Sequence, residues 1–349
     1  MTALLNGGCP SEGKSNSGVK VTVGQSVSKG SVIGKNQNGL RILVCAPSNT
    51  AVDDLAWRIH TSSVGPDGQV GKLNIVRLGN TTVEEKADNR RFVKRGNSWQ
   101  VDNKKKEIFL KRISIDNMLT EATSFVSKRG QIITDSDIVC TTVSGTGSKA
   151  LVESAYHRDS KSDCEFDVII MDEACQVSEQ ASLIPLKYNP RVTILVGDPQ
   201  QLPVFVQKNY PKKFSYGRSL FERLQKNGYP VEMLRYQYRM HPSIAAFPST
   251  QFYSNQLIDS KCVADRPPPP WYKHICFPPY LIWNVNGRMC RSSDGRGLYN
   301  KNEDVFILEK ILSLLFHKFG RNSGKPKSVS IGIISFYNEQ VFIVLSLLQ

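Results

Sequence analysis

The chain has 349 residues, of which 40% are hydrophobic and 22% charged, so it can form two ordinary globular domains and does not resemble a disordered protein. Lys and Arg outnumber Asp and Glu by 45 to 31, which gives a formal net charge of +14. No apolar run reaches the roughly 18 residues that span a bilayer, so we expect no membrane association.

Charge and cysteine usage narrow the class of protein further. The positive surplus favours a polyanionic partner, although a solvated basic surface that keeps the protein soluble would explain it equally well. The opening sequence MTALLNGG has no basic segment before an apolar stretch, so we do not expect secretion. Eight cysteines without a Cys-x-x-Cys pair favour reduced thiols in the cytosol or nucleus over disulfides or a zinc site.

Residues 1–40 are rich in Gly, Ser, Asn and Lys, and we expect a flexible loop or insertion there. Within them, Gly8–Ser15 (GCPSEGKS) matches the Gly-x4-Gly-Lys-Ser pattern of a phosphate-binding loop. Such a loop must follow a buried strand and begin a helix, but only seven residues precede Gly8 and no helical period follows Ser15. The sequence therefore predicts a chance match.

Residues 41–209 show short apolar runs that alternate with segments of helical spacing. This alternation predicts a doubly wound α/β domain with a parallel sheet. A segment at about residues 99–130 differs, because its lysines surround apolar residues at helical spacing, and it predicts an inserted helical arm with a basic face. The expected strands are Arg41–Ala46, Asn74–Gly79, Asp137–Val143, Phe166–Asp172 and Val192–Asp198.

Residues 210–349 are expected to form a second domain. Its predicted strands are Tyr280–Val285 and Val329–Ser335, with a helix from Glu303 to Phe319 between them. Four consecutive prolines at 267–270 predict a stiff surface connection, because proline lacks an amide donor and fixes its own backbone angle.

The apolar run that begins at Phe166 leads into the motif DEAC, which supplies two adjacent carboxylates, Asp172 and Glu173. Ligands of open α/β sheets bind at the carboxyl ends of the strands. One carboxylate there can hold Mg²⁺ while its neighbour polarises an attacking water. A plain acidic helix start is the competing interpretation, since Asp and Glu favour helix N-termini.

A second strand ends in GDPQQLP and should bring Asp198 and Gln201 beside these acids. A glutamine amide can donate to a γ-phosphate oxygen and accept from a water, so it can sense whether the phosphate is present. In isolation, Gly-Asp-Pro is also a common turn sequence.

The third element is QYRMHP, in which Gln237, Tyr238 and Arg239 supply an amide, a ring and a permanent cation. Arg239 could reach a γ-phosphate across a domain cleft, because its planar fork matches phosphate geometry. Tyr238 offers a ring on which a base could stack. Alone, the string would be an ordinary surface sequence.

These motifs together resemble those of superfamily 1B helicases of the up-frameshift-like and senataxin group. CAPSNTAVDDL, DEAC, GDPQQLP, QYRMHPSIAAFPSTQFY and ISFYNEQV occur in that family's order and spacing. The stretch before and through QYRMHP is particularly similar to plant senataxin-like (MAGATAMA-type) helicases. The resemblance implies two RecA-like domains, 41–209 and 210–349, both incomplete, and an ATP-dependent, 5′-to-3′ RNA/DNA helicase core of the kind used in RNA processing or transcription termination.

The resemblance also implies roles for individual positions. Asp172 would position Mg²⁺, Glu173 would be the general base, Gln201 would couple phosphate state to motion, and Arg239 would contact the γ-phosphate of ATP. Tyr238 lies where the nucleotide base is approached, and Asp198 and Gln237 belong to the same nucleotide site. The residues implied to grip the nucleic-acid backbone are Pro47, Ser48, Asn49, Thr141, Thr142, Tyr337 and Gln340.

The sequence departs from the family pattern at both ends. We expect the true phosphate loop to lie upstream of residue 2 and the last motifs beyond residue 349, and so expect no ATP turnover by this chain alone. A non-catalytic nucleic-acid-binding or scaffold protein is therefore the alternative. The implied partner is single-stranded RNA or DNA, or an RNA–DNA hybrid, in the nucleus or otherwise the cytoplasm, whereas protein partners cannot be inferred.

Overall fold

The computed structural model describes residues 40–63, 73–81, 100–119, 125–156, 165–206, 216–292, 297–313, 315 and 331–347. The loop predicted for residues 1–40, with the GCPSEGKS match, lies outside these residues except for Leu40. The chain divides into two compact units, Met1–Leu234 and Arg235–Gln349. The domain boundary expected at residue 210 stays a prediction. None of the described helices is long and apolar enough to span a membrane.

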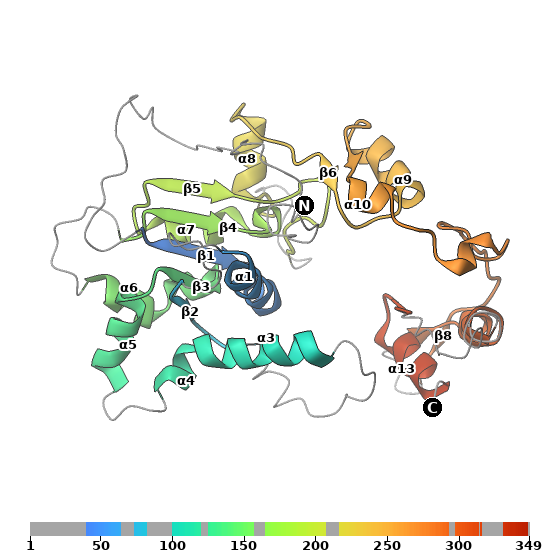
Figure 1. Cartoon of the computed structure of the whole chain (residues 1–349), viewed down its shortest axis with the longest axis horizontal. Coiled ribbons are helices and arrows are strands. Elements are labelled where there is room, and N and C mark those ends of the chain that lie inside the picture. Colours follow the sequence, from blue (N-terminus) through green and yellow to red (C-terminus); the bar gives the residue numbers. More distant parts are fainter. Residues whose placement is uncertain are drawn as a thin grey trace. The chain divides into compact units, whose positions relative to one another are not determined.

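Unit 1, the chain up to Leu234, is built on a five-stranded sheet in the order β2-β3-β1-β4-β5 (Figure 1). Every neighbouring pair is parallel. The doubly wound α/β fold predicted from alternating strands and helices is therefore confirmed for this unit. The strands are β1 (Ile42–Ala46), β2 (Ile75–Arg77), β3 (Ile138–Thr142), β4 (Val168–Met171) and β5 (Val192–Leu195).

Both faces of this sheet are covered, because alternate residues of a strand point to opposite sides. Val44 and Ala46 of β1 pack in a cluster with apolar residues of α1 and α3, while Leu43 and Cys45 pack in a second cluster with residues of α4, α5 and α6. The helices of unit 1 are α1 (Asn49–Ser62), α3 (Gln100–Ile113), α4 (Ile115–Leu119), α5 (Phe125–Thr134), α6 (Lys149–Tyr156), α7 (Glu179–Leu186) and α8 (Leu220–Lys226), with short 3-10 helices η2 (Ser144–Gly147) and η3 (Ala174–Gln176).

The predicted helical arm is present as α3, α4 and the start of α5. Leu110 and Ile113 are buried against α1, whereas Ile108 is exposed among the lysines of the outer face. Lys106 pairs with Asp54 of α1. At its turn from α3 to α4 the arm joins the sheet, since Ser114 forms a parallel bridge with Arg77 at the outer strand β2.

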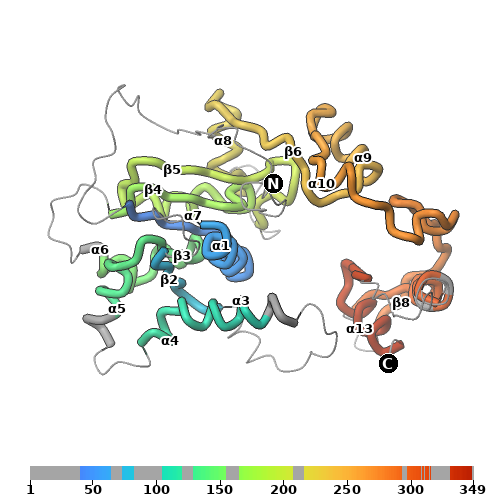
Figure 2. Tube along the Cα trace, in the orientation of Figure 1, coloured from blue at the N-terminus to red at the C-terminus, as the bar shows by residue number. Residues whose placement is uncertain are grey.

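Unit 2, from Arg235 onward, contains two small two-stranded ladders among its described residues. The parallel ladder joins β6 (Tyr236–Gln237) to β7 (Ile258–Asp259), and the antiparallel one joins β8 (Cys290–Arg291) to β9 (Leu298–Tyr299). Figure 2 follows the trace of this unit. Its helices are α9 (Pro242–Phe252), α10 (Lys261–Ala264), the 3-10 helix η5 (Pro270–Lys273), α11 (Lys301–Val305), the π-helix η6 (Phe306–Leu312) and α13 (Asn338–Leu347).

The strands predicted for unit 2 were wrong where the structure describes them. Residues 280–285 and 331–335 lie in no strand, although the helix expected from Glu303 is present and begins at Lys301. Ile282 is 73% exposed and Trp283 41%, and this apolar run pairs with no strand among the described residues. Apolar composition alone cannot form a strand, because a strand needs a partner to satisfy its backbone donors and acceptors.

Candidate nucleotide and nucleic-acid site

The predicted acids follow β4 at the carboxyl edge of the sheet, next to the loop that follows β5. Met171 is in register with Leu195. The Val196 amide donates to the Met171 carbonyl at 2.8 Å, and the Ala174 amide donates back to the Val196 carbonyl at 2.8 Å. These bonds carry the pairing past the strand ends, so the DEAC and GDPQQLP loops lie side by side.

Gly197 is required for this close approach. A Cβ atom at position 197 would lie 2.9 Å from both the backbone nitrogen and the Sγ atom of Cys175. Real Cβ atoms do not approach backbone so closely, and any side chain here would force the two loops apart. Burial raises the pKa of the Cys175 thiol to about 12, and Asp198 and Glu173 add to the shift, so the thiol is held neutral beside these acids.

Asp172 is suited to hold a divalent cation. Asp172 is only 7% exposed, and burial raises the pKa of its carboxyl group. A bound cation would offset that cost by favouring the charged form. Carboxylate oxygen is also the ligand type that Mg²⁺ prefers, and Mg²⁺ usually takes few protein ligands beside waters and substrate phosphates. The described residues contain no group of three or more metal-binding side chains, so Asp172 would hold the ion together with the nucleotide.

Glu173 has a backbone φ of 53°, in the left-handed region that residues with a Cβ atom rarely adopt. Its Oε2 accepts a hydrogen bond from Nε2 of Gln176 at 3.0 Å. Gln176 was not predicted from the sequence, although its position three residues after the proposed base on a short helical turn could have suggested it. The turn and the amide together fix the direction of the Glu173 carboxylate.

Gln201 is held by Asp198 within the second loop. Its Nε2 donates to Asp198 Oδ2 at 2.8 Å, and the Gln200 amide donates to Asp198 Oδ1 at 3.0 Å. Asp198 is 4% exposed, whereas Gln201 is exposed. The buried carboxylate of Asp198 therefore orients the exposed amide of Gln201.

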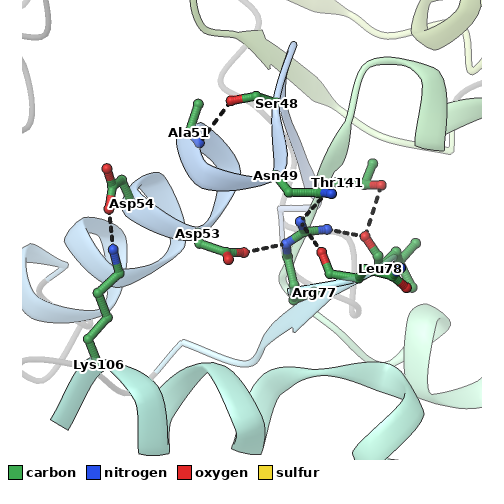
Figure 3. Close-up of polar contacts among 10 residues, drawn as sticks. Ser48, Asn49, Ala51, Asp53, Asp54, Arg77, Leu78, Lys106 and Thr141 are labelled. Carbon is green, nitrogen blue, oxygen red and sulfur yellow. Dashed lines mark hydrogen bonds and ion pairs between the residues drawn. The ribbon is translucent and has the colours of Figure 1, made fainter. Parts of the chain in front are cut away.

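The loop after β1 carries Pro47, Ser48 and Asn49 into the first turn of α1. Ser48 is the N-cap of that helix, and its Oγ accepts from the Ala51 amide at 3.2 Å (Figure 3). Pro47 and Ser48 are exposed, and Asn49 is half-buried. The segment presents its surface at the edge of the sheet that also carries Asp172.

The carboxyl end of β3 holds two threonines, Thr141 and Thr142, with different environments. Thr142 is half-buried, and its Oγ1 accepts from the Gly145 amide at 3.0 Å. Thr141 is 1% exposed, and its Oγ1 donates to the Leu78 carbonyl at 3.2 Å. Its hydroxyl therefore faces the protein interior, and a role of Thr141 in gripping a strand would act through the loop that it supports.

In unit 2, the side chain of Gln237 builds the turn that carries Tyr238 and Arg239. Its Oε1 accepts from the amides of Arg239 (3.0 Å) and Met240 (2.8 Å). Its Nε2 donates to the Met240 carbonyl (2.7 Å) and Asp259 Oδ1 (2.5 Å). Both amide hydrogens and both lone pairs are used, so Gln237 can position the exposed Arg239 but has no group left for a nucleotide.

The last two predicted residues also belong to unit 2. Tyr337 is 51% exposed, just before α13. Gln340 is buried, accepts from the Asn300 amide at 2.7 Å and donates to Asp304 Oδ1 at 2.5 Å. Gln340 thus ties α13 to α11. Units 1 and 2 are each described separately, so the meeting of Arg239 with the acids across a cleft stays a prediction.

Comparison with known proteins identifies the family of the chain. Two family models, both described as an AAA domain, match the chain, one over residues 2–124 and 84–209 and the other over 216–349. The probable helicase MAGATAMA 3 of Arabidopsis thaliana is 37% identical over 310 residues, which cover 86% of this chain and 35% of that protein.

Two further relatives are also named helicases. Helicase SEN1 of Saccharomyces cerevisiae is 29% identical over 368 residues, covering 86% of this chain and 16% of that protein. Probable helicase senataxin of Homo sapiens is 29% identical over 375 residues, covering 86% and 13%. The chain belongs to the senataxin-like group of superfamily 1 helicases. This senataxin-like chain spans 35% or less of the length of these relatives.

Proposed function

We propose that the chain is the motor core of an ATP-dependent, 5′-to-3′ helicase that moves along single-stranded RNA or DNA. The observation that carries this proposal is the shared edge of one parallel sheet. There, the acids after β4 lie beside the Asp198–Gln201 loop, and the loops after β1 and β3 follow strands of the same sheet. One sheet edge therefore presents groups for a triphosphate and groups for a nucleic-acid backbone.

In the proposed mechanism, each residue has one task. Glu173, aimed by Gln176, removes a proton from the attacking water, and Gln201, aimed by Asp198, senses the γ-phosphate. Arg239 of unit 2 neutralises charge on the transferred phosphoryl group. Mg²⁺, when bound at Asp172, would neutralise phosphate charge. Contacts to sugar and phosphate fix the register of a strand without reading its sequence, as movement over any sequence requires.

The partner and its location follow from the same proposal. We infer that the substrate strand is RNA, single-stranded DNA or an RNA–DNA hybrid, handled in the nucleus or otherwise in the cytoplasm. The net charge of +14 supports a polyanionic partner. Imaging of a fluorescent fusion would test the location, and a fusion found in neither the nucleus nor the cytoplasm would contradict it.

The test of the motor function is Glu173→Gln in the complete protein. We expect strand-stimulated ATP hydrolysis to fall by roughly 10²–10⁴-fold, because the general base is lost while the shape of the side chain is kept. Binding of ATP and of single-stranded RNA should remain. The matched control is Glu232→Gln, the same change at an exposed position, which should leave hydrolysis unaltered.

Two outcomes would separate the alternatives. Hydrolysis that is unaffected by Glu173→Gln would overturn the assignment of the base. A wild-type complete protein that binds single-stranded RNA but shows no stimulated hydrolysis would instead support the non-catalytic alternative, a nucleic-acid-binding or scaffold protein that keeps the motor fold.

A further inference from the structure

Arg77 at the end of β2 and Asp53 in α1 form an ion pair in which neither side chain has any exposed surface. Nε of Arg77 donates to Oδ1 of Asp53 at 2.8 Å (Figure 3). Burial of two charges is costly, and an apolar pair of the same volume would stabilise the core as well or better. The pair therefore calls for an explanation other than core stability.

The remaining donors of Arg77 point to strand-end loops. Nη2 donates to Asn49 Oδ1 at 2.9 Å and to the Asn80 carbonyl at 3.0 Å, and Nη1 donates to the Leu78 carbonyl. The chain curls around the guanidinium at Gly79, whose φ of +87° suits glycine. One guanidinium group thus holds the loop after β1 and the loop after β2 in a single arrangement.

The carboxyl end of β3 joins the same network through Leu78. The Leu78 carbonyl accepts from both Arg77 and the buried hydroxyl of Thr141 (Figure 3). The Leu78 amide donates to the Cys140 carbonyl at 2.9 Å. Asn49 and Thr141 are the two residues of the proposed nucleic-acid loops whose side chains are linked to this network, and Ser48 caps the helix that carries Asp53.

We infer that Arg77 is a positioning residue for nucleic-acid binding, which fixes the loop after β1 and the carboxyl end of β3 in the geometry that receives the strand. This inference rests on the proposed function. Because its guanidinium is fully buried, Arg77 does not touch the strand and acts through Asn49 and Thr141. Asp53 balances its charge and directs the fork toward the three carbonyl or amide oxygens of the loops.

The test is the variant Arg77→Lys in the 349-residue chain, with binding of a fluorescein-labelled oligouridine followed by anisotropy at several salt concentrations. Lysine keeps the charge beside Asp53 but cannot reproduce the planar fork. We expect binding to weaken roughly tenfold, the equivalent of a charged hydrogen-bond contact. The slope of log affinity against log salt should not change, whereas loss of a direct phosphate contact would reduce it by about 0.7.

A double-mutant cycle gives a readout that a merely structural role would not produce. If Arg77 acts in part through Asn49, Arg77→Lys should weaken binding less in the Asn49→Ala background than in the wild-type chain. Additive losses would overturn this coupling. The matched control is Asp54→Asn, which breaks the neighbouring ion pair with Lys106 on the same helix and should leave binding unchanged.

The outcomes distinguish this inference from the proposed function. No binding of oligouridine by the wild-type chain would overturn the proposed function and the inference with it. Wild-type binding that Arg77→Lys leaves equal to the Asp54→Asn control would overturn the inference alone. If Arg77→Lys does not fold, Thr141→Val decides, because it removes one buried hydroxyl: a several-fold loss at constant salt slope supports the inference, and unchanged affinity overturns it.

Discussion

The two units position their proposed functional side chains by different means. In unit 1, the residues lie at the ends of parallel strands, so the register of the sheet already brings the loops of Asp172 and Asp198 side by side, and a buried ion pair fixes the adjoining loops. In unit 2, the strand pairs are only two residues long, and buried glutamine amides hold the turn of Arg239 and join α13 to α11.

This difference has a consequence for how each unit tolerates change. A parallel sheet is stabilised by many backbone bonds, so one altered side chain leaves its strand ends in place. A turn held by a single buried amide depends on that amide, because each unsatisfied buried donor or acceptor costs its full desolvation. We therefore expect the stability of unit 1 to be most sensitive to loss of the buried Asp53–Arg77 ion pair. That of unit 2 should be most sensitive to loss of the Gln237 side chain.

The largest expected effect comes from Asp53→Asn, which would break the buried ion pair of unit 1. It leaves the Arg77 charge buried without a counter-charge, so the free energy of unfolding should fall by about 3–5 kcal/mol. The neighbouring Asp54→Asn affects a partly exposed pair and should cost less than about 1 kcal/mol. Urea denaturation of the chain, followed by circular dichroism, measures both, and equal losses would contradict the assigned role of burial.

A smaller effect is expected from Gln237→Ala, which would remove the amide that holds the turn of Arg239 in unit 2. Loss of four hydrogen bonds should lower the free energy of unfolding by about 2 kcal/mol. In the complete protein, hydrolysis should fall with RNA binding unchanged, since the turn carries Arg239. Gln251→Ala, at an exposed position of α9, is the control and should alter neither. Reduced RNA binding with normal hydrolysis would contradict the prediction.

The smallest effect concerns two buried acids, one in each unit, and would sharpen the comparison. Burial raises the pKa of the carboxyls of both Asp172 and Asp304. The folded state therefore holds the proton more tightly than the unfolded state, and stability is lost as pH rises from the ordinary value of 3.8 through the raised one. Asp172→Asn and Asp304→Asn should each be more stable than wild type at neutral pH, with a gain that disappears below that ordinary value.

The two substitutions, Asp172→Asn and Asp304→Asn, should have similar effects on stability but different effects on ATP hydrolysis. Only Asp172→Asn should abolish hydrolysis in the complete protein, because Asp304 hydrogen-bonds to Gln340 inside unit 2. Thermal unfolding across pH, with exposed Asp265→Asn as the control, gives the stability readout. A gain for Asp172→Asn that persists unchanged in acid would show that burial of its charge is not the cause.

The sequence was sufficient for the first sheet because its central strands are apolar runs, such as ILVCA, which a parallel sheet buries on both faces. The same reasoning failed at Tyr280–Val285, because this largely apolar run pairs with no strand among the described residues, and pairing is a long-range property. Likewise, the residues of DEAC and GDPQQLP could be found from motifs. The roles of Arg77, Gln176 and the fully used amide of Gln237 could not, since they depend on partners brought close only by folding.

The left-handed backbone at Glu173 has a consequence for laboratory evolution of this protein. A residue with a Cβ atom pays roughly 1 kcal/mol for that conformation, and glycine does not. Selection of variant libraries for heat resistance alone would thus enrich Glu173→Gly, a substitution that removes the proposed base. Screens for more heat-resistant variants of this protein should therefore measure ATP hydrolysis in every round.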